Sequence, residues 1–245
     1  MKAFAWTMIS VTLFFARPAC ADTVFTDNTF NLADYSVSSF QSGGATISIT
    51  QTATGGDPGS ALSIFTSLPF PVAESYSGTS WFLNKGFVYD PASQGELQSI
   101  NVSVDLFLLF TGQNPALVAF TPVIVQGGNY YSFHIPTTFT EGSYIAVAKD
   151  GLTAADFDLV TSMLDGSQNP AVHPDFSGGP LDFGFGSGLA SSNVFKTVTR
   201  DARYDNLSFD LLSTTPEPKT AILVLVGLVM VALGVRRTGR RALRR

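Results

Sequence analysis

Side chains able to do acid–base or nucleophilic chemistry are few in this sequence. The chain has two histidines, His134 and His173, and one cysteine, Cys20. His134 stands in an alternating segment that favours a structural role in a strand, and His173 stands in a loop rich in turn residues. The run Gly-Phe-Gly-Ser-Gly at 184–188 places glycine where a G-x-S-x-G elbow needs its serine. A Ser-His-Asp triad remains open, because its members can be far apart in sequence.

Glycoside hydrolysis needs two carboxylates about 5–9 Å apart, one as acid and the other as base or nucleophile. Before the last thirty residues the sequence has only Glu74, Glu96 and Glu141, and none stands in the E-x-D-x-x-E spacing that puts both groups on one strand. We therefore predict no catalytic residue. The alternative is a secreted hydrolase acting on polysaccharide, for which Asp175, His173 and these glutamates are the first candidates.

A structural calcium ion is the one cofactor for which the sequence offers candidates. Calcium takes six to eight oxygen ligands, and sandwich domains often hold an ion between their first and last strands. Asp27 with Asn28 near the start, and Asp205 with Asn206 near the end, could supply oxygens. No D-x-D-x-D-G loop is present. The alternative is that these residues make Asx turns and cap strand ends.

Sugar binding commonly rests on aromatic rings that stack on the sugar, with polar groups at the rim. Trp81, Tyr130 and Tyr131 are candidates by residue type, as is Tyr76. The alternative for each ring is packing in the core or at a strand edge. Residue type alone does not separate the two.

The charge of the chain is unevenly distributed. All 19 acidic residues lie between Asp22 and Glu217, whereas only five basic residues lie there, so this segment carries a net charge of −14. Such a surface repels phosphate backbones, and nucleic acid is therefore excluded as a partner. Soluble cations or neutral sugars fit it better.

Many short segments of the middle region alternate polar and apolar residues, which is typical of half-buried strands. Glycine- and proline-rich turns separate them, and only 153–156 has a helical start, with a capping-box pattern. We predict strands over 46–50, 61–65, 86–89, 99–106, 117–125, 130–135, 144–148, 181–185 and 204–211. This pattern predicts a mainly β fold, an antiparallel sandwich spanning residues 22–213.

Short motifs of this region resemble bacterial surface proteins with a laminin-G or concanavalin-like jelly roll. They are Gly-Gly-Asp-Pro-Gly at 55–59, Gly-Phe-Val-Tyr-Asp-Pro at 86–91 and Tyr-Asp-Asn-Leu-Ser-Phe at 204–209. The resemblance implies a jelly-roll-like β-sandwich and, less specifically, a ligand-binding domain.

The first 21 residues have the three parts of a secretory signal peptide. Lys2 supplies a positive charge, 3–15 form an apolar run, and small residues at Ala19 and Ala21 make the A-x-A cleavage pattern. The predicted mature chain begins at Asp22. Since the only cysteine is removed with this segment, the mature chain forms no disulfide and has no thiol chemistry.

The last 32 residues, 214–245, read as a membrane anchor with a charged tail. An uncharged stretch, 220–235, is followed by six arginines, which keep the C-terminus on the cytoplasmic side. At about 1.5 Å per residue the stretch reaches about 24 Å, a little short of the hydrocarbon core. The arginines of the tail 236–245 are Arg236, Arg237, Arg240, Arg241, Arg244 and Arg245.

The tripeptide Pro216-Glu217-Pro218 stands directly before this helix and tail. The three parts together resemble the PEP-CTERM sorting signal of Gram-negative bacteria that make exopolysaccharide. In that family an exosortase in the membrane is thought to remove the helix and pass the protein to the surface. The resemblance implies exosortase and the secretion machinery as partners, a transient inner-membrane anchor, and a location at the cell surface or outside the cell. We therefore expect a non-catalytic surface or matrix protein, binding or structural in an exopolysaccharide matrix.

Overall fold

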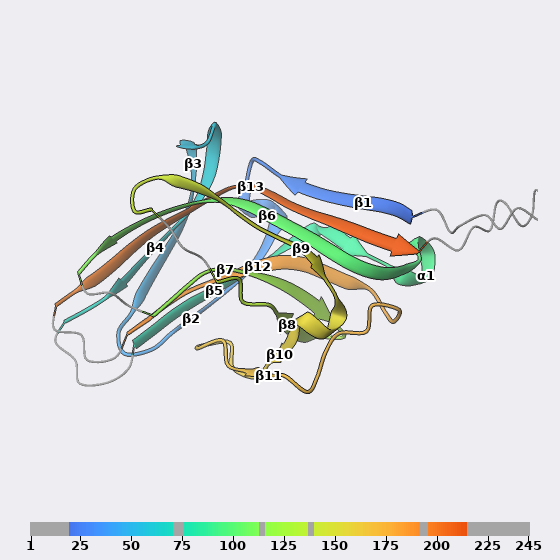
Figure 1. The fold of residues 1–245 in the computed structure, drawn as a ribbon. Coiled ribbons are helices and arrows are strands. Elements are labelled where there is room, and N and C mark those ends of the chain that lie inside the picture. Colours follow the sequence, from blue (N-terminus) through green and yellow to red (C-terminus); the bar gives the residue numbers. More distant parts are fainter. Residues whose placement is uncertain (1–19, 71–75, 113–115, 137–139, 192–195, 215–245) are drawn as a thin grey trace, which may run out of the picture. The chain divides into compact units, whose positions relative to one another are not determined.

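Two antiparallel β-sheets lie face to face in the computed structural model, and they confirm the predicted sandwich (Figure 1). Among the described residues no helix is long and apolar enough to cross a membrane. The signal region through Ala19, the Pro-Glu-Pro motif, the predicted helix and the arginine tail all lie outside those residues. The structure describes residues 20–70, 76–112, 116–136, 140–191 and 196–214.

The first sheet, called sheet A, has its centre at the last strand of the chain. The order is β3-β4-β13-β6-β9, and β1 also pairs with β13. The bounds are β1 Cys20–Asp27, β3 Thr46–Gly56, β4 Gly59–Leu68, β6 Glu96–Thr111, β9 Tyr144–Leu152 and β13 Val198–Thr214.

The second sheet, called sheet B, places β12 between β7 and β5. Its order is β11-β10-β8-β7-β12-β5-β2. The bounds are β2 Tyr35–Gln41, β5 Tyr76–Tyr89, β7 Ala116–Gln126, β8 Asn129–Ser132, β10 Asp158–Val160, β11 Gln168–Asn169 and β12 Leu181–Ser191. The described helices are single turns: η1 Leu32–Asp34, α1 Pro91–Gln94 and η2 Ala154–Asp156. In η2, Thr153 and Asp156 form the predicted capping box.

Alternation along the strands sorts side chains between the core and the two outer faces. In β6, Val102, Val104 and Leu106 are buried while the residues between them are partly exposed. This is the period of two that a pleated strand imposes. The same alternation in β5 points Phe82 into the core and Trp81 to the opposite face of sheet B.

Phenylalanine dominates the core between the sheets. Phe82 stacks on Phe185 with ring centroids 4.9 Å apart, and Phe185 also lies 4.9 Å from the ring of Tyr204 on sheet A. Buried aromatic pairs of this kind contribute about 0.5–1.5 kcal/mol beyond the area they bury. The core is therefore held by rings that reach across from both sheets.

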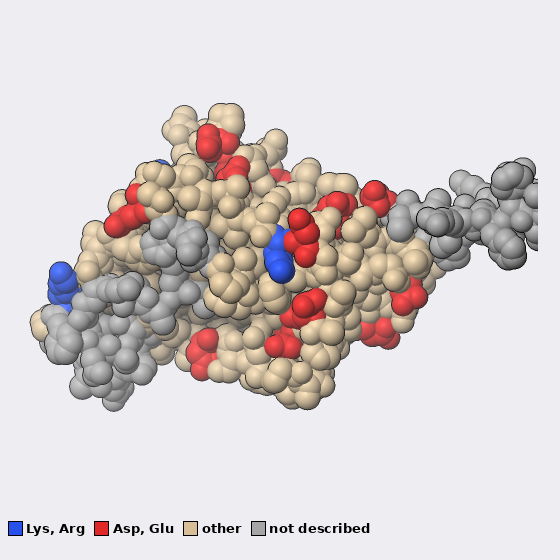
Figure 2. Space-filling model, viewed as in Figure 1, with Lys and Arg blue, Asp and Glu red and all other residues tan. Residues whose placement is uncertain are grey.

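Residues Ala21–Thr214 form one compact unit, called the body below. Its limits lie one residue outside the predicted limits at each end, because β1 begins at Cys20 and β13 runs to Thr214. Both sheets and the core that joins them are complete within this unit, so the body contains its own folding core. On the face shown in Figure 2, acidic side chains greatly outnumber basic ones, as the charge of the sequence predicts.

Candidate functional site

A pocket of about 400 Å³ lies on the outer face of sheet B, away from sheet A. Its walls come from β5, β7, β8 and β12 and from the turn between β10 and β11. Sites for small molecules typically have volumes of about 300–1,000 Å³. The pocket is therefore large enough for a ligand the size of a sugar unit.

The hollow arises because a glycine lies between two larger side chains. Trp81 on β5, Gly186 on β12 and Thr121 on β7 are direct neighbours across three strands. A Cβ atom at Gly186 would come within 2.9 Å of the Trp81 ring. The missing side chain lets the indole lie against β12 and leaves space beside it. In the next row Gly188 pairs with Thr79 and lines the same pocket.

A turn over residues 161–167 is fastened to the outer face of sheet B by three side chains of β5. Ser77 Oγ and Thr79 Oγ1 each donate to the Leu164 carbonyl oxygen at 2.7 Å. Trp81 Nε1 donates to the Met163 carbonyl oxygen at 2.9 Å. The three donors occupy alternate positions of one strand, so they point to the same face. They position the turn as one wall of the pocket.

One lining residue, Thr121, has a buried hydroxyl without a partner in the described part of the chain. Thr121 is 4% exposed, and its Oγ1 has no hydrogen-bond partner among the described residues. Leaving a buried hydroxyl without a partner costs about 1–3 kcal/mol. Thr121 is one of the lining residues, but its Oγ1 is shielded from solvent, so this atom is not open to a ligand in the pocket.

Polar groups also line the pocket. Ser132, Gln168, His134 and Asp165 contribute a hydroxyl, an amide, an imidazole and a carboxylate. Gln168 Nε2 donates to the Ser132 carbonyl oxygen at 2.7 Å and to its Oγ at 2.8 Å. Hydrogen bonds from Ser162 and Ser167 lower the pKa of the Asp165 carboxyl, so this group is ionised at neutral pH. The site thus combines several neutral hydrogen-bonding groups with one negative charge.

Side chains from sheet A hold the pocket floor from behind. Arg200 is fully buried, and its Nη1 donates to the Gly188 carbonyl oxygen at 2.7 Å. The Tyr204 hydroxyl lies 2.5 Å from both the Ala119 carbonyl oxygen and Ser187 Oγ. Burial lowers the pKa of Arg200 and raises that of Tyr204. These contacts fix β12 where its register with β7 shifts between Gly186 and Gly188.

The structure places the predicted sugar-binding rings in different surroundings. Trp81 lines the pocket but is only 3% exposed. Tyr130 meets it edge-on, with centroids 6.2 Å apart and planes at 71°. Tyr131 is buried in the main core. Packing accounts for Tyr131, and Trp81 borders the pocket without being an open stacking surface. The side chain of Tyr76 lies outside the described residues.

The predicted calcium ligands are engaged in local hydrogen bonds. Asp27 accepts from Thr29 N and Phe30 N, each at 2.8 Å, and from Tyr35 Oη at 2.7 Å. This is the Asx-turn alternative for Asp27.

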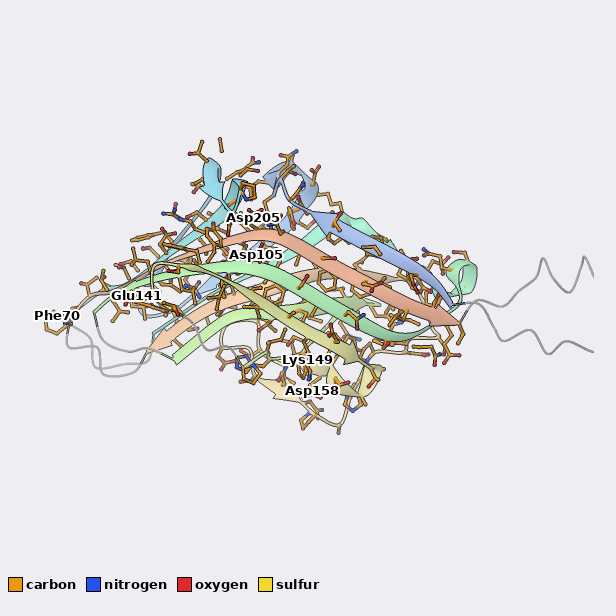
Figure 3. All side chains as sticks on the ribbon, turned by 45° about the horizontal axis from the view of Figure 1, so that its top comes forward. Phe70, Asp105, Glu141, Lys149, Asp158 and Asp205 are labelled. Atoms are coloured by element: carbon orange, nitrogen blue, oxygen red, sulfur yellow. The ribbon has the colours of Figure 1, made fainter. Side chains whose placement is uncertain are left out.

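Asp205 lies next to Asp105 on sheet A and accepts from Asp57 N at 2.6 Å and Asn206 N at 2.8 Å (Figure 3). Within the described ranges no three His, Cys, Asp or Glu side chains are arranged to hold a metal. Calcium binding stays a prediction.

The candidates for hydrolysis are dispersed. His173 Nδ1 lies 3.0 Å from the Phe157 carbonyl oxygen and 3.5 Å from Asp158 Oδ1, so its partner is not Asp175. Glu141 accepts from Phe110 N at 2.9 Å, and Glu74 lies outside the described residues.

Glu96 and Asp175 do line a second pocket, of about 360 Å³. However, hydrogen bonds from Ser177 lower the pKa of Asp175, whereas a general acid needs a raised one. Glu96 is exposed at the start of β6. Asp175 is therefore poorly suited to be the proton donor that glycoside hydrolysis requires.

Sequence reasoning did not identify Thr121, Gly186 or Asp165 as site residues. The three lie on β7, on β12 and in the turn after β10, and only strand pairing and the docked turn bring them together. No local motif marks them. The repeated Gly-x-Gly of 184–188 was the one available signal, and it indicates close approach of other groups to a strand.

Comparison with known proteins gives no family. No protein-family model matches the sequence, and no curated protein matches it. One similar solved structure is a family 11 carbohydrate-binding module from Clostridium thermocellum in complex with a β-1,3-1,4-mixed-linked tetrasaccharide. Its TM-score is 0.44 and its identity is 13%, and the match covers 80% of this chain and 98% of that chain.

Two other solved structures are similar at lower scores. The family 11 carbohydrate-binding module of the Clostridium thermocellum cellulosomal cellulase Lic26A-Cel5E has a TM-score of 0.40 and 12% identity, covering 80% of this chain and 96% of that chain. The CBM22-1 xylan-binding domain of Paenibacillus barcinonensis Xyn10C has a TM-score of 0.37 and 10% identity, covering 80% of this chain and 99% of that chain. Because all three TM-scores are below 0.5, we infer nothing about the function of this chain from them.

Proposed function

We propose that this protein is an exported, non-catalytic surface protein whose body binds polysaccharide in the pocket on the outer face of sheet B. The observation that carries the proposal is a pocket of about 400 Å³ whose lining includes the hydroxyl of Ser132, the amide of Gln168 and the carboxylate of Asp165. A hydroxylated ligand suits such a lining, because each of its hydroxyl groups supplies both a donor and an acceptor.

The remaining pocket groups suit the same ligand. Hydroxyls, an amide and a carboxylate can each bond sugar hydroxyls, while the lining also includes the apolar residues Trp81, Leu189 and Ala190. Ligand sites usually combine apolar walls with a few well-placed polar groups in this way. The described lining holds no pair of carboxylates, which favours binding over hydrolysis.

The route to the surface rests on the two ends of the sequence. We propose export through the signal peptide of residues 1–21, followed by exosortase sorting at Pro216-Glu217-Pro218. Mass spectrometry of the protein recovered from the cell surface tests this. We expect Asp22 as the first residue and a C-terminus that lacks the arginine tail. An intact tail contradicts processing, and an unprocessed N-terminus contradicts the signal peptide.

Binding can be measured with the intrinsic fluorescence of the body. Trp6 and Trp81 are the two tryptophans of the chain, so the body retains Trp81 alone, at the pocket. Titration with a panel of soluble polysaccharides should change its emission and should saturate. Affinity electrophoresis in gels containing the same polymers gives an independent measure. A body that binds no polymer of the panel contradicts the proposal.

A hydrolase remains the alternative in a different class, on the observation that Glu96 and Asp175 line one pocket. Release of reducing ends from the same panel measures it. If release occurs and is abolished by Glu96→Gln or Asp175→Asn, the non-catalytic proposal is wrong. We expect no release.

A further inference from the structure

The described lining of the sheet B pocket carries one negative charge and no lysine or arginine to balance it, and this bears on the class of ligand. The described lining residues include one carboxylate, Asp165, and neither lysine nor arginine. His134, at the mouth, is the only other titratable side chain among them. A ligand in this pocket therefore meets one negative charge and no fixed positive one.

The position of Asp165 is fixed by local hydrogen bonds. Asp165 Oδ1 accepts from Ser167 N at 3.0 Å, and Gly166 N donates to the Ser162 carbonyl oxygen at 2.9 Å. The turn that carries these residues is fastened to β5 through Met163 and Leu164. The charge therefore stays at the mouth of the pocket instead of moving away with a free loop.

Asp165 remains able to accept further hydrogen bonds. A carboxylate has about four lone-pair sites, and hydrogen bonds from Ser162 and Ser167 occupy part of them. The residue is exposed, so the sites that remain face the solvent, where a ligand can reach them. Neighbouring hydroxyls of a neutral sugar can both donate to one carboxylate, and such charge-assisted bonds are stronger than neutral ones.

An anionic sugar meets the opposite situation. A uronate or sulfate group near Asp165 places two like charges together, and because Asp165 is exposed their repulsion is strongest at low salt. Arg200 donates a hydrogen bond to a lining residue of the pocket, but it cannot neutralise these two negative charges directly. Its guanidinium is fully buried between the sheets and donates to Gly188 from behind the floor.

We propose that Asp165 makes the pocket selective for neutral polysaccharide chains, by accepting hydrogen bonds from sugar hydroxyls and by repelling carboxylated or sulfated chains. This proposal rests on the proposed function. Repulsion by Asp165 acts only in the pocket, whereas the net negative charge of the whole body repels anionic polymers at any site.

A matched control is available elsewhere in the body. Asp175 is also exposed and also accepts from the backbone of the residue two positions on, with Ser177 N at 2.9 Å from its Oδ1. It lies outside the lining of the sheet B pocket. The variants Asp165→Asn and Asp175→Asn each remove one negative charge, so their net charges are equal and only the location differs.

The experiment compares neutral polymers with their anionic derivatives. The probes are hydroxyethylcellulose with carboxymethylcellulose, dextran with carboxymethyl dextran, and a soluble β-1,3-glucan with its carboxymethyl form. Binding to the unchanged body, Asp165→Asn and Asp175→Asn is measured by Trp81 fluorescence and affinity electrophoresis at low and at physiological salt.

We expect the unchanged body to bind at least one neutral polymer on the order of tenfold more tightly than its carboxymethyl form. Asp165→Asn should lower this ratio several-fold, by losing affinity for the neutral polymer and gaining affinity for the anionic one. Asp175→Asn should leave the ratio unchanged.

Two outcomes overturn the inference and differ from each other. Equal binding of neutral and anionic forms, or an equal effect of the two variants, contradicts the role of Asp165 and leaves polysaccharide binding in place. A body that binds none of the polymers, neutral or anionic, contradicts the proposed function and the selectivity together.

Discussion

Two buried hydroxyls of the body stand in opposite situations. Thr121 Oγ1 has no partner among the described residues, whereas the Tyr204 hydroxyl contacts both Ala119 and Ser187. A polar group contributes to stability only when its hydrogen bonds are made, and otherwise it lowers stability. Removing these two hydroxyls should therefore change the free energy of unfolding in opposite directions.

The variant Thr121→Val should be more stable than the unchanged body. Valine has nearly the same shape as threonine and removes the unpartnered hydroxyl, so we expect a gain of about 1 kcal/mol in the free energy of unfolding. Urea denaturation measures this gain. Thr50→Val, at an exposed position of β3, is the control. A loss of stability in Thr121→Val contradicts the absence of a partner for this hydroxyl.

The variant Tyr204→Phe should be less stable. The change leaves the Ala119 carbonyl and the Ser187 hydroxyl without their buried partner, at a cost of about 1–3 kcal/mol. Denaturation midpoints at an unchanged slope give this difference. An increase in stability contradicts the hydrogen bonds described for this residue.

At the scale of the elements, β12 determines the shape of the pocket because it carries glycine at alternate positions. A Cβ atom at Gly186 would meet the Trp81 ring and one at Gly188 would meet Thr79, and both glycines line the pocket. At Gly184 a Cβ atom would come within 1.8 Å of the Phe82 carbonyl oxygen, which is backbone and cannot move aside. Position 184 therefore accepts only glycine because neighbouring backbone atoms leave no room for a Cβ atom, and not because its φ angle is left-handed.

The variant Gly186→Ala should close part of the pocket. Its new Cβ would press on the Trp81 ring, which is held by its bond to Met163 and by neighbouring side chains. Overpacking of this kind costs about 1–3 kcal/mol. We expect lower stability, a shifted Trp81 emission and weaker binding. Gly179→Ala is the control, because nothing lies within 4 Å of the added atom there. Equal behaviour of the two variants contradicts the packing of Trp81 on β12.

The strands were predictable wherever period-two alternation is clear. The alternation over 99–106 predicts the middle of β6, and that over 46–50 predicts the start of β3. By contrast, β2 and the first half of β5 are rich in serine and threonine, so their alternation gives little contrast. The pocket was not predictable, because its residues come from distant strands and acquire their roles only through strand pairing.

For the whole molecule, several tyrosines link stability to alkaline pH. Burial, with the neighbouring Asp27 carboxylate, raises the pKa of Tyr35, and burial raises that of Tyr144 to about 12. Burial also raises the pKa of Tyr89. A raised pKa means that the folded state favours the neutral phenol. Its contribution to stability is complete below the unfolded pKa of about 10 and is lost as the pH rises through the folded value.

We therefore expect the free energy of unfolding to fall as the pH rises from about 10 to about 12. Urea denaturation over this range measures the fall, and the ultraviolet absorbance of tyrosinate follows ionisation directly. In the folded body a fraction of the tyrosines should ionise only above the value seen in urea. Ionisation of all tyrosines near pH 10, before unfolding, contradicts the burial of these phenols.

The central position of β13 in sheet A has a consequence for the order of assembly. β13 spans Val198–Thr214 and pairs with both β4 and β6, so the last segment of the body joins strands made much earlier. A chain that emerges from its N-terminus, from the ribosome or through a membrane pore, exposes the unpaired edges of β4 and β6 until these residues arrive. Non-local pairing of this kind folds slowly. Sheet A therefore cannot be completed until the residues through Thr214 have emerged.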